Sequence, residues 1–105
     1  MREVKVGDNI YLRQYGRLIR IETVISLPRT MIRSENYNYD YPTNDSNFLN
    51  IKGRDRWQTV YAYLETEELK KEWHEQRLKQ WIANNHQNIP IDLIEKIKNE
   101  MEKKL

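Results

Sequence analysis

Short runs of β-branched and aromatic residues follow one another through residues 4–63, and this succession constrains the fold more than any other feature. Glycine, proline and polar turn residues separate the runs, which is typical of short strands. The runs cover residues 10–15, 18–27, 30–33, 48–51 and 57–64. Five short strands with turns between them predict a small antiparallel β-barrel of the SH3-like or Greek-key type.

The longest run, residues 18–27, has two chemically different faces, because successive side chains of a strand point to opposite sides. One face is mixed and carries Leu18, Arg20, Glu22 and Val24. The other face is apolar or β-branched and carries Ile19, Ile21, Thr23 and Ile25. We expect the second face to point into the core.

Residues 65–105 have the pattern of two helices. Thr66 is a suitable N-cap, and acidic residues follow it in the first turn. We expect this helix to run to about Ala83, to pack its first half on the sheet and to meet the final helix with Leu78, Trp81 and Ile82. The chain is therefore predicted to be an α+β protein in which a helical hairpin follows the barrel.

The final helix is predicted to begin near Pro90, because proline suits the first helical turn. Its apolar stripe consists of Leu93, Ile97, Met101 and Leu105, with Ile94 beside it. The same stripe fits packing within the monomer and packing across the two-fold axis of a homodimer.

A chain of 105 residues is expected to be a single domain, here with a barrel over residues 1–64 and a two-helix extension over residues 65–105. The sequence has no cysteine, which suits a reducing compartment. It also has no apolar run of membrane-spanning length and no apolar leader at its start. We therefore expect a cytoplasmic protein with no membrane partner.

Basic charge is concentrated in the first part of the chain. Residues 1–64 hold 10 basic and 7 acidic side chains, and eight of the basic residues are arginines. Residues 65–105 hold 8 basic and 9 acidic side chains. Arginine offers a planar fork that suits phosphates, carboxylates and aromatic faces. The arginines are therefore candidates for partner contacts, or they pair with acids of their own domain.

Residues that could support catalysis are scarce. The histidines are His74 and His86, and the position at which a zinc-protease helix would need a second histidine is occupied by Leu78. The acids of the loops match no metal-binding spacing, and no serine lies beside a histidine in an arrangement that suggests an activated nucleophile. We predict no enzyme activity, no metal site and no cofactor.

Binding is better supported by the alternation of Tyr37, Tyr39 and Tyr41 with polar residues, which points all three rings the same way in an extended chain. Tyrosine can stack on unpaired bases or form a protein-recognition surface. An alternative is that the rings only cover the open end of the barrel. The candidate partner-binding residues are Tyr37, Tyr39, Tyr41, Arg13, Arg20, Arg33, Arg54 and Arg56.

Four short segments carry a resemblance to a known group of proteins. They are VGDNIY at 6–11, ETVI at 22–25, VYAYLETEE at 60–68 and IDLIEKI at 91–97. In this order they resemble the small "β-barrel domain" proteins that are frequent in tailed-phage genomes. The resemblance extends over nearly the whole chain and implies an origin and a fold, since the group carries no established activity.

These observations lead to two alternative functions. In the first, the chain is a non-enzymatic accessory protein of phage type that occupies a surface of a host protein or nucleoprotein, as anti-CRISPR inhibitors of host defence do, in the host cytoplasm. In the second, it is a β-barrel that binds single-stranded DNA or RNA through arginine and tyrosine side chains.

Overall fold

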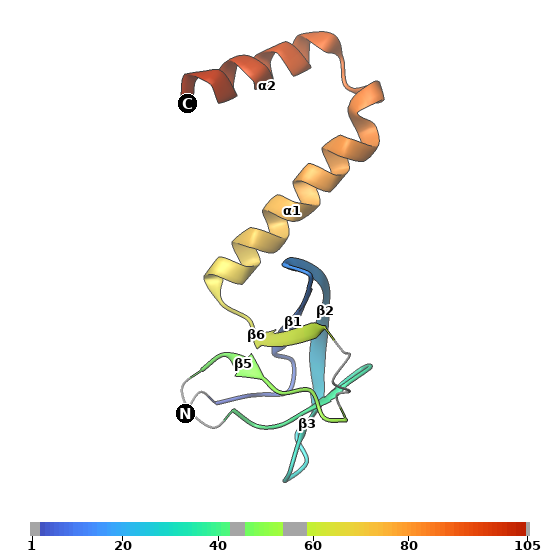
Figure 1. Cartoon of the computed structure of the whole chain (residues 1–105), viewed down its shortest axis with the longest axis vertical. Helices are drawn as coiled ribbons and strands as arrows, with labels where there is room; N and C mark the ends of the chain where they lie inside the picture. The colour runs from blue at the N-terminus through green and yellow to red at the C-terminus, as the bar shows by residue number, and fades with distance from the viewer. Residues whose placement is uncertain (1–2, 43–45, 54–58, 105) are drawn as a thin grey trace. The chain divides into compact units, whose positions relative to one another are not determined.

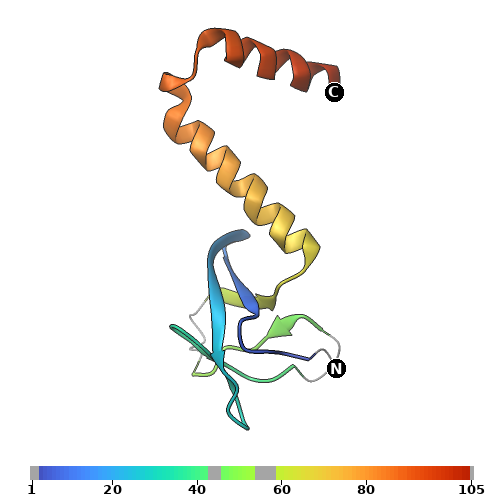
Figure 2. The same ribbon diagram turned by 180° about the vertical axis from the view of Figure 1, so that it is seen from behind.

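The centre of the sheet is an antiparallel hairpin of β1 (Asn9–Gln14) and β2 (Arg17–Ser26), seen from two sides in Figures 1 and 2. The structure is a computed structural model that describes residues 3–42, 46–53 and 59–104. The turn of the hairpin is formed by Tyr15 and Gly16, whose φ angles are 52° and 76°. Two successive positive φ angles are those of a type I′ turn, whose twist matches that of paired strands.

Six strands form the sheet, in the order β4-β3-β2-β1-β6-β5. The other strands are β3 (Ile32–Ser34), β4 (Asn38–Tyr39), β5 (Phe48–Leu49) and β6 (Val60–Leu64), and all pairings are antiparallel. The predicted barrel-like antiparallel sheet is thus confirmed, but the predicted number of five strands is wrong. The additional strand, β4, lies in the tyrosine-rich segment, outside the five predicted runs.

The two ends of the sheet meet, so that it is nearly closed. Tyr39 of β4 forms a bridge with Ile51, just after β5. The Asp40 amide donates to the Asn50 carbonyl at 2.8 Å, and the Lys52 amide donates to the Asn38 carbonyl at 2.8 Å. These bonds pair backbone groups that an open sheet edge would leave exposed.

The core is lined by alternate residues of the strands, and the prediction for β2 is wrong. Leu18, Glu22 and Val24 of the mixed face are buried, with Glu22 only 3% exposed. On the other face, Ile19 is 46% and Ile25 is 52% exposed. The mixed face can be buried because hydrogen bonds satisfy the Glu22 carboxylate, whereas a buried carboxylate without partners would be costly.

Two helices follow the sheet, α1 (Glu67–Asn85) and α2 (Ile91–Lys104), with the short 3-10 helix η1 (His86–Asn88) between them. Thr66 caps α1 as predicted, since its Oγ1 accepts a hydrogen bond from the Leu69 amide at 3.1 Å. The chain divides into two units, Met1–Trp73 and His74–Leu105. The first turns of α1 therefore belong to the unit that contains the sheet.

In the first unit, the first turns of α1 pack on the outer face of the sheet, as expected. The ring of Trp73 meets the ring of Tyr11 edge to face, with 6.5 Å between their centroids. In the second unit the two predicted helices are present. However, no described residue of α1 or α2 is buried, so the closed core expected of a helical hairpin is not formed by the described residues. Among the described residues, neither helix combines the length and apolarity that a membrane crossing requires.

Candidate interaction surfaces

The three tyrosines predicted to bind a partner do not share an exposed face. Tyr39 is fully buried, and its hydroxyl lies 3.0 Å from Ser34 Oγ. Tyr37 and Tyr41 are half-buried, and the Tyr41 hydroxyl donates to the Pro28 carbonyl at 2.8 Å. The expectation of a common tyrosine surface is wrong for Tyr39 because its segment forms the strand that closes the barrel.

The predicted arginines are in different environments. Arg13 donates from both Nη atoms to the two carboxylate oxygens of Glu72, each at 2.7 Å. Arg20 is 3.7 Å from Glu22 and keeps 54% of its side chain exposed. Arg33 is exposed, and within the described part of the chain no ion pair involves it. Arg54 and Arg56 lie outside the described residues.

The Arg13 pair joins β1 to α1 by a planar, two-bond contact. The hydrogen bond from Arg13 holds the pKa of the Glu72 carboxyl below its usual value. Arg13 also donates to the carbonyl of Gly16 at 3.0 Å, which fixes the hairpin turn. Arg13 therefore stabilises the fold of the chain itself.

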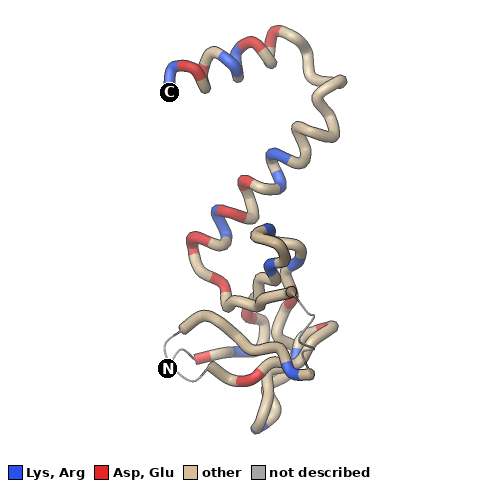
Figure 3. Tube along the Cα trace, in the orientation of Figure 1, with Lys and Arg blue, Asp and Glu red and all other residues tan. Residues whose placement is uncertain are grey.

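Figure 3 shows the basic residues interspersed with acidic ones along the described chain.

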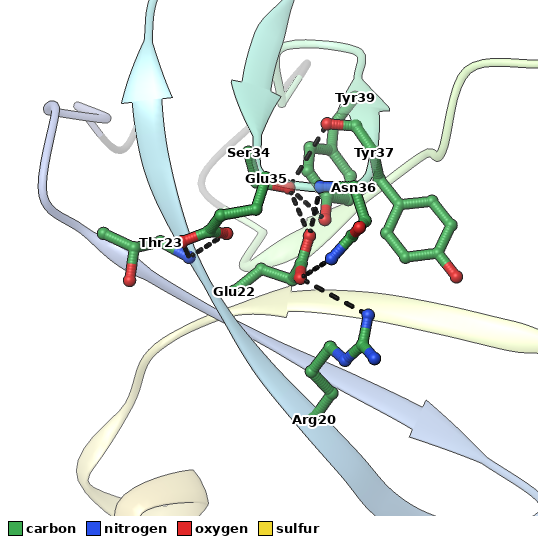
Figure 4. Close-up of polar contacts among 8 residues, drawn as sticks. All are labelled: Arg20, Glu22, Thr23, Ser34, Glu35, Asn36, Tyr37 and Tyr39. Carbon is green, nitrogen blue, oxygen red and sulfur yellow. Dashed lines mark hydrogen bonds and ion pairs between the residues drawn. The ribbon is translucent and has the colours of Figure 1, made fainter.

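Glu22 is the centre of a buried polar network, which is drawn in Figure 4. Its Oε1 accepts hydrogen bonds from Ser34 Oγ at 2.8 Å and from the Asn36 amide at 2.9 Å. Its Oε2 accepts from Asn36 Nδ2 at 2.8 Å. Because Ser34 gives its proton to the carboxylate, the Tyr39 hydroxyl donates to Ser34 Oγ.

The network determines the protonation of its members. Burial acts to raise the pKa of Glu22, but the hydrogen bonds from Asn36 and Ser34 outweigh it, and the pKa lies below its usual value. Burial raises the pKa of Tyr39 to about 12. No buried side-chain nitrogen or oxygen in the described residues lacks a partner. The network is therefore saturated and offers no free group to a ligand.

A second carboxylate stabilises the connection between β3 and β4, which also contains Asn36. Glu35 accepts from the Thr23 amide with both oxygens, at 3.0 and 3.3 Å. Glu22 and Glu35 together attach the β3–β4 connection to β2. Neither role could be predicted from the sequence, because the donors and acceptors lie on segments more than ten residues apart.

Most of the exposed large apolar side chains among the described residues belong to the second unit. We define the helical apolar face as eight large side chains that are each between 40% and 72% exposed: Leu78, Trp81, Ile82, Ile91, Leu93, Ile94, Ile97 and Met101. A groove of about 340 Å³ lies on it, lined by side chains of α1 and α2 together with Asn88, Ile89 and Pro90. The sequence pattern predicts an apolar side on each helix, but it also predicts that the two helices cover these sides, and this second prediction is wrong for the described residues.

A strained tyrosine is the most exposed aromatic residue described in the first unit. Tyr15 has a φ of 52°, which is uncommon for a bulky side chain, and it is 83% exposed. Its ring stands at the tip of the β1–β2 hairpin, whose turn Arg13 holds. Tyr15 was not among the predicted binding residues, although its place directly before Gly16 is typical of a hairpin turn.

Comparison of the chain with protein-family models, curated proteins and solved structures finds no match.

Proposed function

We propose that this chain is a non-enzymatic binding protein that acts by occupying a surface of a protein partner, and that the helical apolar face makes the contact. The observation that carries the proposal is the exposure of eight large apolar side chains on two consecutive helices. Soluble proteins rarely expose a contiguous apolar patch of this kind unless it binds something. Trp81 and Met101 belong to the residue types that are enriched at interfaces.

The more specific form of the proposal is an accessory protein of phage type in a host cytoplasm. It rests on the resemblance of the sequence to small phage barrel proteins, and it takes the barrel as an SH3-like or Greek-key scaffold for the helices. The partner would then be a host protein or nucleoprotein, such as a component of a defence system, whose surface the helices occupy.

Binding of single-stranded nucleic acid has less support among the described residues. Base stacking needs exposed rings, and Tyr39 is fully buried. Phosphate contacts need free guanidinium groups, and Arg13 is held by Glu72 on both nitrogens. We therefore retain the protein partner as the proposed function.

Site-specific photo-cross-linking tests the proposal with a control on the same helix. A photoreactive residue replaces Ile97, on the apolar face, or Asn99, which lies about 200° further round α2. We expect a protein adduct at position 97 and little at position 99, in cells that express the chain. Equal adducts at both positions, or none at position 97, would contradict the proposal.

A further inference from the structure

The tip of the β1–β2 hairpin holds a tyrosine that the fold itself does not require. Tyr15 has a φ of 52°, in the left-handed region that a residue with a bulky side chain rarely adopts. It is 83% exposed, and within the described part of the chain its ring has no hydrogen-bond or aromatic partner. Asparagine or glycine would form the same type I′ turn with less strain. The tyrosine therefore lowers stability without a contact that offsets the loss, and strained residues of this kind are concentrated at functional sites.

Side-chain contacts hold the turn of this hairpin in place. The Arg13 guanidinium donates to the Gly16 carbonyl at 3.0 Å, and both of its Nη atoms donate to Glu72 at 2.7 Å. At the end of the same strand, Gln14 Nε2 donates to Thr59 Oγ1 at 3.0 Å. These bonds fix the backbone of the turn. An aromatic side chain on a fixed backbone loses little conformational entropy on binding, because only its two χ angles are still free.

The residues that follow Tyr15 add a cation and an apolar side chain to the tip. Arg17 is exposed, and no described residue forms an ion pair with it. Ile19 lies two residues further along β2 and is 46% exposed. Tyrosine and arginine are among the residue types that most often dominate the binding energy of a protein interface. The tip therefore presents an aromatic ring and an exposed guanidinium group within three residues.

The charges of the hairpin favour a protein over a nucleic acid as the partner of the tip. A strand of nucleic acid presents a series of phosphates, so its binding sites combine exposed rings with several available cations. Of the three arginines in the hairpin, Arg13 and Arg20 already lie beside carboxylates, at 2.7 and 3.7 Å. Among the described residues only Arg17 lacks such a partner in this hairpin. One cation beside one ring fits an apolar pocket that has a carboxylate at its rim.

We propose that the hairpin tip is a contact site separate from the helical apolar face, at which Tyr15 enters an apolar pocket of a protein partner and Arg17 pairs with a carboxylate at the rim of that pocket. The inference goes beyond the proposed function, because it assigns a contact to the first unit. It depends on the proposed function only in that the partner is a protein.

Photo-cross-linking followed by competition tests the tip contact. We place p-azidophenylalanine, which has nearly the shape of tyrosine, at position 15 in cells that express the chain, and we expect a protein adduct that survives nuclease treatment. Purified full-length chains without the photoreactive residue then compete for adduct formation in the lysate. Tyr15→Asn and Arg17→Glu should each require at least about 10-fold higher concentrations than the unchanged chain. Arg33→Glu, the same charge change at another exposed arginine, is the matched control and should compete as well as the unchanged chain.

The competition separates a lost contact from a lost fold. Because asparagine relieves the strain of the turn, Tyr15→Asn should compete less well although its free energy of unfolding in urea is higher. Arg17→Glu leaves the residues of the turn unchanged and provides a second, independent variant. The absence of a protein adduct at position 15, an adduct that nuclease removes, or equal competition by Tyr15→Asn or Arg17→Glu would overturn the inference.

The adducts at positions 15 and 97 distinguish this inference from the proposed function. An adduct at position 97 without one at position 15 refutes the tip contact and leaves the helical apolar face standing. An adduct at position 15 that shows the expected competition, without one at position 97, supports the tip contact and contradicts the helical apolar face.

Discussion

Removal of the Glu22 carboxylate should destabilise the first unit more than any other single polar change in the described residues. The carboxylate is 3% exposed and accepts three hydrogen bonds, from Ser34 Oγ, the Asn36 amide and Asn36 Nδ2. Each hydrogen bond to a charged group contributes about 1.5–3 kcal/mol. Simple addition would overestimate the loss, because Asn36 is exposed and its donors can bind water in the variant. Ser34 can also turn to the Tyr37 carbonyl, 3.2 Å away.

We therefore expect Glu22→Ala to lower the free energy of unfolding by about 2–4 kcal/mol, and Asn36→Ala by about 1 kcal/mol. Arg20→Ala is the matched control. Its guanidinium is 3.7 Å from the same carboxylate but more than half exposed, so its loss should change stability by less than about 0.5 kcal/mol.

Urea unfolding followed by near-ultraviolet circular dichroism of tyrosine measures these values. All seven tyrosines belong to the first unit, so their signal reports that unit. A loss below about 0.5 kcal/mol in Glu22→Ala, equal to that in the Arg20→Ala control, would refute the role assigned to the network.

The same network predicts a dependence on pH. The pKa of Glu22 is lower in the folded chain than in the unfolded chain, so the unfolded state binds the proton more readily. Its stabilisation is complete at neutral pH and is lost as the pH falls below about 4 and through the folded pKa. The difference in stability between the unchanged protein and Glu22→Gln should therefore shrink on acidification. A constant difference down to pH 3 would show that the charge of Glu22 is not what the network stabilises.

Three further predictions concern the first unit. Arg13→Lys should lower stability by about 0.5–1 kcal/mol in urea unfolding, because lysine cannot keep both bonds to Glu72; an unchanged midpoint would contradict this. Tyr15→Asn should raise stability by about 0.5–1 kcal/mol, since asparagine tolerates the positive φ of 52° better, and a lower melting temperature would refute the strain. In an ultraviolet titration, Tyr11 and Tyr39 should ionise last, near pH 12, because burial raises the pKa of both to about 12. Since their pKa is near 10 in the unfolded chain, their stabilising effect should be lost between about pH 10 and 12, and complete ionisation at pH 10 with the fold intact would contradict it.

The elements that could be predicted from the sequence are those with local causes. The turn at Gly16, the N-cap at Thr66 and the proline before α2 each depend on neighbouring residues, and the structure confirms the elements they delimit. The short β4 strand was missed because Asn38 and Tyr39 lie in a long polar segment, and the alternation of its tyrosines was interpreted as a binding surface. Their strand exists because β3 and the segment after β5 offer backbone partners on both sides.

The orientation of β2 could not be predicted for a related reason. Alternation separates two faces of a strand but does not determine which face is buried. A glutamate on one face of a strand indicates that this face is exposed to solvent, unless hydrogen-bond donors to its carboxylate are known. Those donors, Ser34 and Asn36, follow Glu22 by more than ten residues and reach it only after the chain has turned back. The prediction that Tyr39 is exposed is wrong for the same reason, since the partner strands of β4 bury it.

The two units differ in whether their described side chains have partners within the same unit, and our proposal that binding occurs at the second unit depends on this difference. In the first unit, strand pairing closes the sheet and two carboxylates attach the β3–β4 connection, so its buried polar groups have partners among the described residues. In the second unit, the helices leave the helical apolar face exposed. A change such as Ile97→Asp should therefore abolish binding while the unfolding of the first unit in urea stays the same. If Glu22→Ala abolished binding without unfolding the first unit, the contact surface would have to be sought on the barrel instead.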